Sequence, residues 1–88
     1  MKKRCLVIDG KDNVAVLLEK AQQGDTIEVG EKIIALEEDI DFGHKVALCD
    51  IAEGANVYKY GEEIGYMLQS IQKGGWIHNH NMGCRRGK

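Results

Sequence analysis

Short apolar blocks, each bounded by glycine or charged residues, run along the whole chain. Blocks of four or five residues that are rich in β-branched and aromatic side chains are typical of strands. They predict strands at residues 4–8, 26–29, 32–36, 45–48, 56–60 and 76–80. Gly30 and Glu31 separate the second strand from the third and form a two-residue turn compatible with a hairpin.

Two further segments have the apolar spacing of a helix. The first follows Asp12, a residue that caps helix N-termini well, and predicts a helix over residues 13–22. Its apolar side consists of Val14, Leu17, Leu18 and Ala21. The second lies at residues 64–71, where Gly65 interrupts the pattern, and predicts a shorter helix.

One arrangement of apolar residues and glycine occurs three times. At steps of three residues it has two apolar residues, a glycine and a β-branched residue. The copies are Leu18-Ala21-Gly24-Ile27, Leu48-Ile51-Gly54-Val57 and Leu68-Ile71-Gly74-Ile77. We read each copy as one helical turn, a left-handed glycine that ends it, and a strand. The chain is therefore expected to form a mostly β fold with a minor α part: a barrel-like or clip-like domain with one N-terminal helix and short helical corner turns.

The size of the chain limits what it can do alone. Its 88 residues suffice for one domain with a thin hydrophobic core. Such a core does not readily enclose a deep substrate pocket, so a partner chain or self-association is expected. A homodimer could form by exchange of an end strand.

Charge and composition exclude several classes of protein. A formal charge of −2 offers no footprint for nucleic acid, and no stretch of 18 apolar residues predicts a membrane span. Charged residues interrupt any apolar core of a secretion signal, so a cytoplasmic location is expected. The three cysteines show no paired spacing and are read as free thiols.

Candidate chemistry gathers around histidine and lysine. His78 and His80 lie two apart on an expected strand, so both rings would face the same way and could ligate a transition metal, or act as one ligand and one general base. The alternative is a pair of exposed histidines on an edge strand. His44 is a third candidate, but three or four ligands at a recognisable spacing are lacking.

Two lysines are candidates for binding a carboxylate. Lys45 and Lys59 could do so as cations, with the Tyr60 hydroxyl as a further donor. The alternative for each lysine is an ordinary solvated side chain.

Three stretches of the chain carry a family resemblance. They are residues 43–48 (GHKVAL), 57–65 (VYKYGEEIG) and 74–81 (GGWIHNHN), with Ile51 and Gly54 between them. Together they resemble the N-terminal domain of altronate and galactarate dehydratases, called a SAF domain and described as a β-clip fold. The segment 12–16 also resembles the start of that domain. Asn79 departs from the family pattern, in which an apolar residue separates the two histidines.

The resemblance implies two settings for the domain. It begins a long dehydratase chain, or it forms a small subunit beside a large catalytic one, as in sulfolactate sulfo-lyase. The basic end of this chain is similar to the tails of the small subunits. We therefore expect a SAF domain at residues 1–82, a flexible basic tail at 83–88, and a large catalytic subunit as partner.

The resemblance also implies a lyase reaction on a hexonate or hexarate, with loss of water (or of sulfite in the sulfo-lyase branch). A divalent metal, iron(II) in the dehydratases, would be shared with the partner chain. By position in the motifs, His44, His78 and His80 are expected to be catalytic, and the last two to bind metal. Lys45, Lys59, Tyr60 and Asn81 are expected to bind substrate.

Two other hypotheses stay open. The chain could be a non-catalytic module of the same fold that binds a sugar acid. In that case the lone chain would bind the acid without a large partner. It could also be a structural β domain that dimerises through edge strands and is indifferent to metal and sugar acids.

Overall fold

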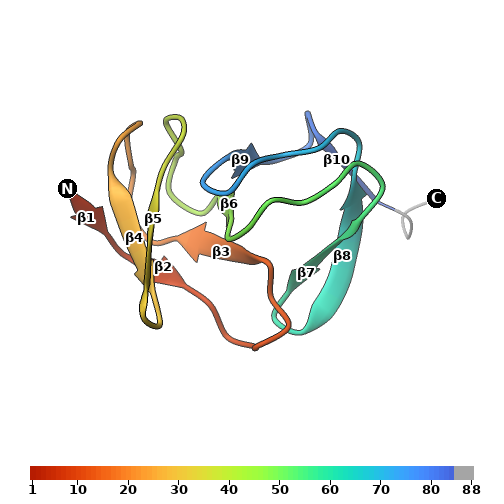
Figure 1. The fold of residues 1–88 in the computed structure, drawn as a ribbon, viewed down its shortest axis with the longest axis horizontal. Helices are drawn as coiled ribbons and strands as arrows, with labels where there is room; N and C mark the ends of the chain where they lie inside the picture. Colours follow the sequence, from red (N-terminus) through yellow and green to blue (C-terminus); the bar gives the residue numbers. More distant parts are fainter. Residues whose placement is uncertain (85–88) are drawn as a thin grey trace.

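The protein is all-β within residues 1–84, the part of the chain that the computed structural model describes (Figure 1). Its strands are β1 (Lys2–Lys3), β2 (Cys5–Leu6), β3 (Val14–Leu17), β4 (Thr26–Val29), β5 (Lys32–Ala35), β6 (Lys45–Ala47), β7 (Asn56–Lys59), β8 (Glu62–Met67), β9 (Trp76–Ile77) and β10 (Met82–Gly83). The mostly β prediction is confirmed. The expected minor helical part is wrong for these residues.

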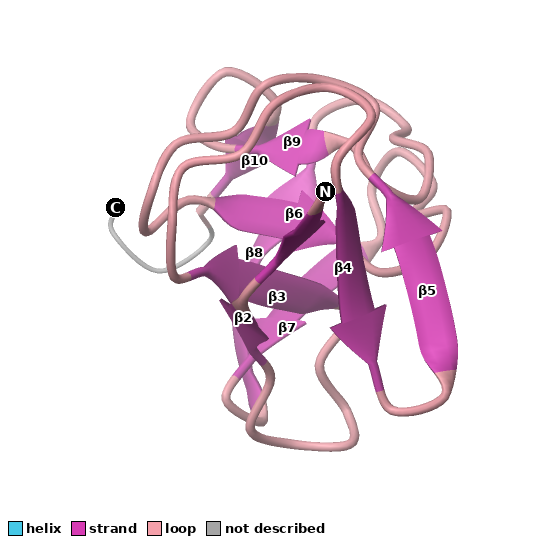
Figure 2. Ribbon diagram, turned by 90° about the vertical axis from the view of Figure 1, so that its left-hand side faces the viewer, coloured by secondary structure: helices cyan, strands magenta, loops and turns pink. Residues whose placement is uncertain are grey.

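The strands form three small sheets (Figure 2). The central sheet has the order β2-β3-β6-β9 and is antiparallel throughout. One outer sheet contains the β4–β5 hairpin with β1 alongside β4, and the other contains the β7–β8 hairpin with β10 alongside β8. In Figure 1 the two hairpins stand at opposite ends of the molecule, with the central sheet between them.

The glycine repeat is real, and the structure contains four copies of it. Each copy is a bend, a bridging residue, a turn with a left-handed glycine, and a strand whose second residue is buried. The additional copy is Glu37-Ile40-Gly43-Val46, which the sequence pattern missed because its first residue is charged. The four glycines are Gly24, Gly43, Gly54 and Gly74, with φ between 83° and 93°. The predicted left-handed glycines and following strands are confirmed, but the apolar pair forms no helical turn.

The copies join in pairs, which gives the domain two similar halves. Ala21 and Ile40 form an antiparallel bridge at the base of the β4–β5 hairpin, with N···O distances of 2.9 and 3.0 Å. Ile51 and Ile71 form the same bridge at the base of the β7–β8 hairpin, with both distances at 2.9 Å. Each half is therefore a hairpin clamped at its base, and the central sheet joins the two.

The predicted helix over 13–22 is wrong because this segment enters the middle of the central sheet. β3 pairs with β2 on one side and with β6 on the other. Both of its faces are covered: Ala15 and Leu17 pack into one core cluster, and Val14 packs into a second. A strand buried on both faces is apolar without alternation, so its pattern can imitate that of a buried helix.

The shorter predicted helix at residues 64–71 is also wrong. Residues 62–67 are the strand β8, which is paired on both sides. Gly65 allows this, because a Cβ atom there would overlap the carbonyl oxygen of Gly83 on β10. The glycine that interrupted the helical pattern therefore marks a close approach between two strands.

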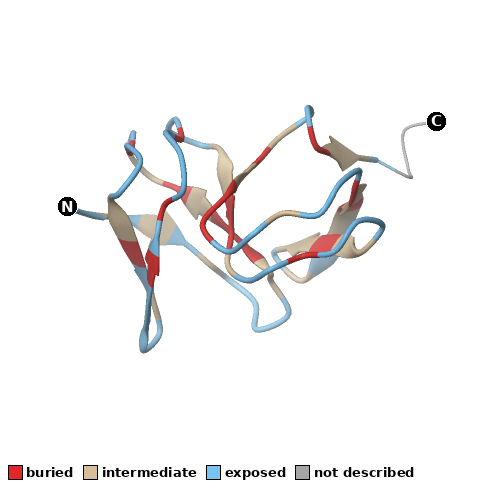
Figure 3. Cartoon of the chain, turned by 45° about the horizontal axis from the view of Figure 1, so that its top comes forward, coloured by how far each residue is buried: buried red, intermediate tan, exposed pale blue. Residues whose placement is uncertain are grey.

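The hydrophobic core consists of two clusters, one on each face of the central sheet. Figure 3 marks the buried positions along the chain. The first core cluster is Ala15, Leu17, Ala21, Ile27, Ile34, Leu36, Ile40 and Val46. The second core cluster is Val14, Ala47, Ile51, Val57, Met67 and Ile77. The buried β-branched residues of the four repeat copies divide equally between them. Each half of the domain thus closes over its own small core.

Asp12 links the β2–β3 loop to the β7–β8 turn instead of capping a helix. One carboxylate oxygen accepts the Gly61 N–H from the turn between β7 and β8 at 2.8 Å, and the other accepts the Asp9 N–H at 3.2 Å. Burial alone would raise the pKa of Asp12, but backbone hydrogen bonds lower it below the usual range. The donors are Gly61, Asp9, Tyr60 and Ile8.

We expect Asp12 to make the free energy of unfolding fall as the pH is lowered into the acid range. Because its pKa is lower in the folded than in the unfolded state, its stabilisation is complete above the unfolded value of about 4 and is lost as pH falls through the folded value. Urea unfolding from pH 7 to pH 2 should show a smaller loss in Asp12→Asn than in the wild type. The wild type should lose about 1–2 kcal/mol more of its free energy of unfolding than the variant, since water replaces part of each hydrogen bond. Equal losses in the two proteins would contradict this assignment.

Candidate functional site

All three histidines and the only tryptophan of the chain meet at one place. In the second repeat copy His44 directly precedes β6, which begins at Lys45; in the fourth copy Trp76 begins β9, and His78 follows that strand. β6 and β9 pair antiparallel with Lys45 opposite Ile77, and the same register brings His44 opposite His78. The pairing of β6 with β9 thus brings together the motif around His44 and the motif around Trp76, which lie more than thirty residues apart in the sequence.

The aromatic rings form a compact stack. His44 lies against His78 with ring centroids 4.6 Å apart and planes 8° from parallel. The Trp76 indole N–H donates to Nδ1 of His44 at 3.1 Å, and the two rings are within 9° of parallel. His80 contacts Trp76 at 4.6 Å with a tilt of 44°. Sequence reasoning did not select Trp76, although it lies in a quoted motif and is the only indole in the chain.

His78 and His80 do not share one face of a strand, because β9 ends at Ile77. They lie in a tight turn that Asn81 holds in place. The Asn81 amide oxygen accepts the His78 N–H and the Asn81 side-chain NH₂ donates to the Trp76 carbonyl, both at 2.9 Å. Asn81 is 5% exposed, so its observed contacts are internal to the turn. Substrate binding by Asn81 stays a prediction.

Replacing Asn81 should loosen this turn. Asn81→Ala leaves the His78 N–H and the Trp76 carbonyl without their partner, and we expect a loss of about 2 kcal/mol in the free energy of unfolding. Asn79→Ala, at an exposed neighbouring position, is the matched control and should change it by less than about 0.5 kcal/mol. Chemical denaturation measures both, and His78 amide exchange reports on the turn. Equal effects of the two variants would contradict the structural role.

Lys45 lies near His78 of the ring stack, and Lys59 lies near Lys45. Lys45 is half-buried, and burial, followed by the positive charge of Lys59, lowers its pKa. Within residues 1–84 neither lysine forms an ion pair with a carboxylate. Two neighbouring cations with no carboxylate partner among these residues favour an anionic ligand.

His78 favours its neutral form. Burial lowers the pKa of His78, and the charges of His44, Lys45 and His80 lower it further. A neutral imidazole retains a lone pair that can accept a proton or bind a metal.

Tyr60 lies in the β7–β8 turn, away from the ring stack. It has a φ of 57°, the only positive φ among the non-glycine residues of the described chain. The Lys59 ammonium lies 5.0 Å from the centroid of its ring. Tyr60 thus contacts Lys59, and substrate binding by Tyr60 stays a prediction.

The histidines fit a metal only in part. No group of three or more histidine, cysteine, aspartate or glutamate side chains within residues 1–84 is placed to hold an ion. The near-parallel rings of His44 and His78 do not direct their lone pairs at a common point, and Nδ1 of His44 already accepts the indole N–H. Metal binding by His78 and His80 stays a prediction, and further ligands would have to come from another domain or chain.

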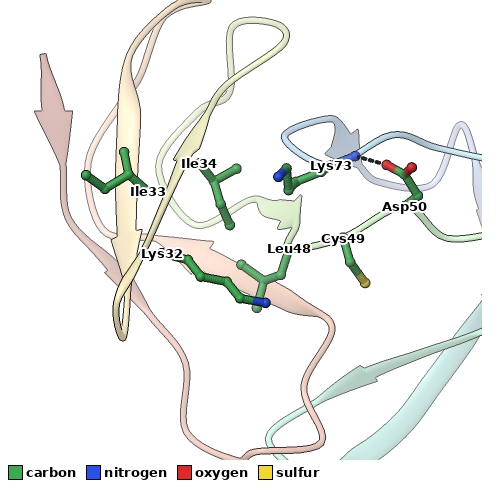
Figure 4. Close-up of a pocket in the computed structure, with 7 residues that line it drawn as sticks. All are labelled: Lys32, Ile33, Ile34, Leu48, Cys49, Asp50 and Lys73. Carbon is green, nitrogen blue, oxygen red and sulfur yellow. Dashed lines mark hydrogen bonds between the residues drawn. The ribbon is translucent and has the colours of Figure 1, made fainter.

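The chain by itself does not enclose a substrate here. The hollow beside His44 and Trp76 measures about 150 Å³, below the 300 Å³ or more typical of ligand pockets. A larger groove of about 530 Å³ lies between β5 and the segment after β6 (Figure 4). It is bordered by Lys32, Leu48 and Cys49, contains no histidine, and has its carboxylate, Asp50, bonded to the Lys73 N–H at 2.9 Å.

Fold and site together define a small all-β domain that carries an open cluster of histidine and tryptophan rings. The chain matches the family model described as the altronate/galactarate dehydratase SAF domain over residues 3–85, and it belongs to that family. The resemblance drawn from the motifs is thereby confirmed. The predicted flexible tail starts at Gly83, but Gly83 belongs to β10 and pairs with Tyr66 on β8. Residues 85–88 of the predicted tail lie outside the described part of the chain.

Several curated proteins are similar to this chain. Altronate dehydratase of Escherichia coli is 47% identical over 74 residues, which cover 84% of this chain and 15% of that enzyme. Altronate dehydratase of Bacillus subtilis is 38% identical over 79 residues, which cover 90% of this chain and 16% of that enzyme. The alpha subunit of (2R)-sulfolactate sulfo-lyase of Chromohalobacter salexigens is 45% identical over 47 residues, which cover 53% of this chain and 50% of that subunit. The chain thus spans only a small part of the altronate dehydratases it resembles.

With no helix among residues 1–84, the described part of the chain contains no helical segment long and apolar enough to cross a membrane.

Proposed function

We propose that this chain is the accessory part of a sugar-acid dehydratase and supplies one wall of an active site that a larger catalytic chain or domain completes. The observation that carries the proposal is the histidine ring stack with Lys45 near His78 and Lys59 near Lys45, since neither lysine has a carboxylate partner among the described residues. A hexonate or hexarate carries the carboxylate that such a site lacks.

The residues divide between binding and proton transfer. Lys45 and Lys59 bind the substrate carboxylate as cations. Neutral His78 accepts a proton or ligates a metal, and its exposed neighbour His80 faces the missing wall. Iron(II), when bound with ligands from the partner, would polarise the substrate and stabilise negative charge next to the carboxylate.

A sulfite-releasing lyase is the second candidate. The sulfo-lyase alpha subunit is matched over half of its own length, a larger share than in the altronate dehydratases. This favours a setting in which the domain is a separate subunit. Both candidates place a carboxylate on the same two lysines, and they differ in the group that leaves.

Anaerobic purification of the tagged chain from its native host tests the proposal. We expect a large chain to co-purify and the complex to eliminate water from altronate or galactarate, or sulfite from sulfolactate. Lys45→Met should lower kcat/KM at least about 100-fold, which corresponds to about 2.7 kcal/mol of transition-state stabilisation. Lys32→Met, at an exposed lysine on the groove of Figure 4, is the matched control and should leave kcat/KM unchanged.

Three results would contradict the proposal. The first is a chain that elutes alone. The second is a complex inactive on all three acids, and the third is equal activity of the two lysine variants. A lone chain that binds a sugar acid would favour the non-catalytic binding module, and a symmetric dimer indifferent to acids would favour the assembly domain.

A further inference from the structure

The bond between Trp76 and His44 determines which nitrogen of His44 carries its proton. An indole N–H can only donate, so Nδ1 of His44, 3.1 Å away, must be the acceptor. A neutral imidazole has one N–H and one lone pair. With the lone pair of Nδ1 directed at the indole, the hydrogen of neutral His44 lies on Nε2.

The surroundings of His44 keep this arrangement in place. Trp76 is held on β9 opposite Val46, and Asn81 binds the Trp76 carbonyl at 2.9 Å. On its face, His44 is covered by the ring of His78 at 4.6 Å. The His44 ring is therefore restrained both in its plane, by the indole, and across its plane, by a second imidazole.

We propose that Trp76 is a positioning residue that holds His44 in its Nε2–H tautomer, so that His44 offers a hydrogen-bond donor, not a metal ligand, to an oxygen of the bound acid. The donor role toward substrate rests on the proposed function, whereas the tautomer itself does not. His44 and His78 then differ in task although their rings are stacked. His44 donates to the substrate, and His78 keeps a lone pair for a proton or a metal.

The composition of the chain makes the tautomer directly measurable. Its three histidines and single tryptophan all belong to the site. Uniform ¹⁵N labelling of histidine gives only three imidazoles in a two-bond ¹H–¹⁵N spectrum. Replacement of tryptophan by benzothienylalanine, in which sulfur takes the place of the indole N–H, alters position 76 alone and keeps the ring shape.

At alkaline pH, where imidazoles are neutral, we expect His44 in the unsubstituted protein to show a protonated Nε2 and an unprotonated Nδ1. With benzothienylalanine at position 76, its two nitrogen shifts should move toward each other as both tautomers become populated. The tautomers of His78 and His80 should not change, which serves as the internal control. An Nδ1–H tautomer in the unsubstituted protein, or shifts that the sulfur isostere leaves unchanged, would overturn the proposal.

A second measurement separates this inference from the proposed function. Altronate binding to the complex should weaken about fivefold with the isostere, the effect of losing one oriented hydrogen bond. Unchanged affinity together with the expected tautomer shift would overturn the donor role while the positioning by Trp76 stands. A complex inactive on every acid would count against the proposed function and leave the tautomer result valid.

Discussion

Replacing Gly74 by alanine should destabilise the domain by about 3 kcal/mol or more. Gly74 has a φ of 91°, and an L side chain in the left-handed region costs about 1–2 kcal/mol. In addition, its Cβ atom would overlap the carbonyl oxygen of Ala35 on β5. The backbone cannot move aside easily, because the Gly74 N–H donates to Ala47 at 2.8 Å and its carbonyl accepts from Glu37 at 2.9 Å.

The repeat supplies a matched control for this variant. Gly54 occupies the same position in another copy with a φ of 84°, but a Cβ atom there has no neighbour within 4 Å. Gly54→Ala should therefore cost only about 1–2 kcal/mol from the backbone conformation. Urea denaturation of both variants gives the difference. If Gly74→Ala were no more destabilising than Gly54→Ala, the close approach to β5 would be incorrect.

Replacing Ile77 by alanine should cost about 3 kcal/mol and disturb the site. Ile77 is fully buried in the second core cluster and pairs with Lys45 across β6 and β9. Truncation of a buried isoleucine removes transfer free energy and leaves a cavity, with typical losses of about 2–5 kcal/mol. A domain of this length has a total stability of roughly 4–13 kcal/mol, so the loss is a large share of it.

Ile33→Ala is the control, because the same truncation at a residue that is 68% exposed on β5 should change stability by less than about 0.5 kcal/mol. Fluorescence of Trp76, next to Ile77, reports on the site in the same experiment. We expect a shifted emission spectrum in Ile77→Ala and the wild-type spectrum in Ile33→Ala. Similar stabilities of the two variants would mean that the second core cluster is not packed as the structure shows.

Three of the four glycine turns could be predicted from local residue spacing alone. The sequence spacing located Gly24, Gly54 and Gly74 and the strands after them, because a left-handed turn and a β-branched strand start leave direct marks in residue type. It missed the copy at Gly43, where Glu37 replaces the leading apolar residue. That copy carries His44, so one of the two copies that build the site is the copy that departs from the pattern.

What the sequence determined by itself is therefore the left-handed glycine turns, the β4–β5 hairpin and the set of candidate histidines and lysines. These depend on local conformation and on residue type, both of which can be read along the chain. Tertiary structure decided that residues 14–17 form a strand, since burial on both faces comes from β2, β6 and the two cores. It also decided the site: only the pairing of β6 with β9 stacks His44 on His78 and brings the indole N–H of Trp76 to His44. Such contacts depend on register between distant strands, which spacing along one chain does not encode.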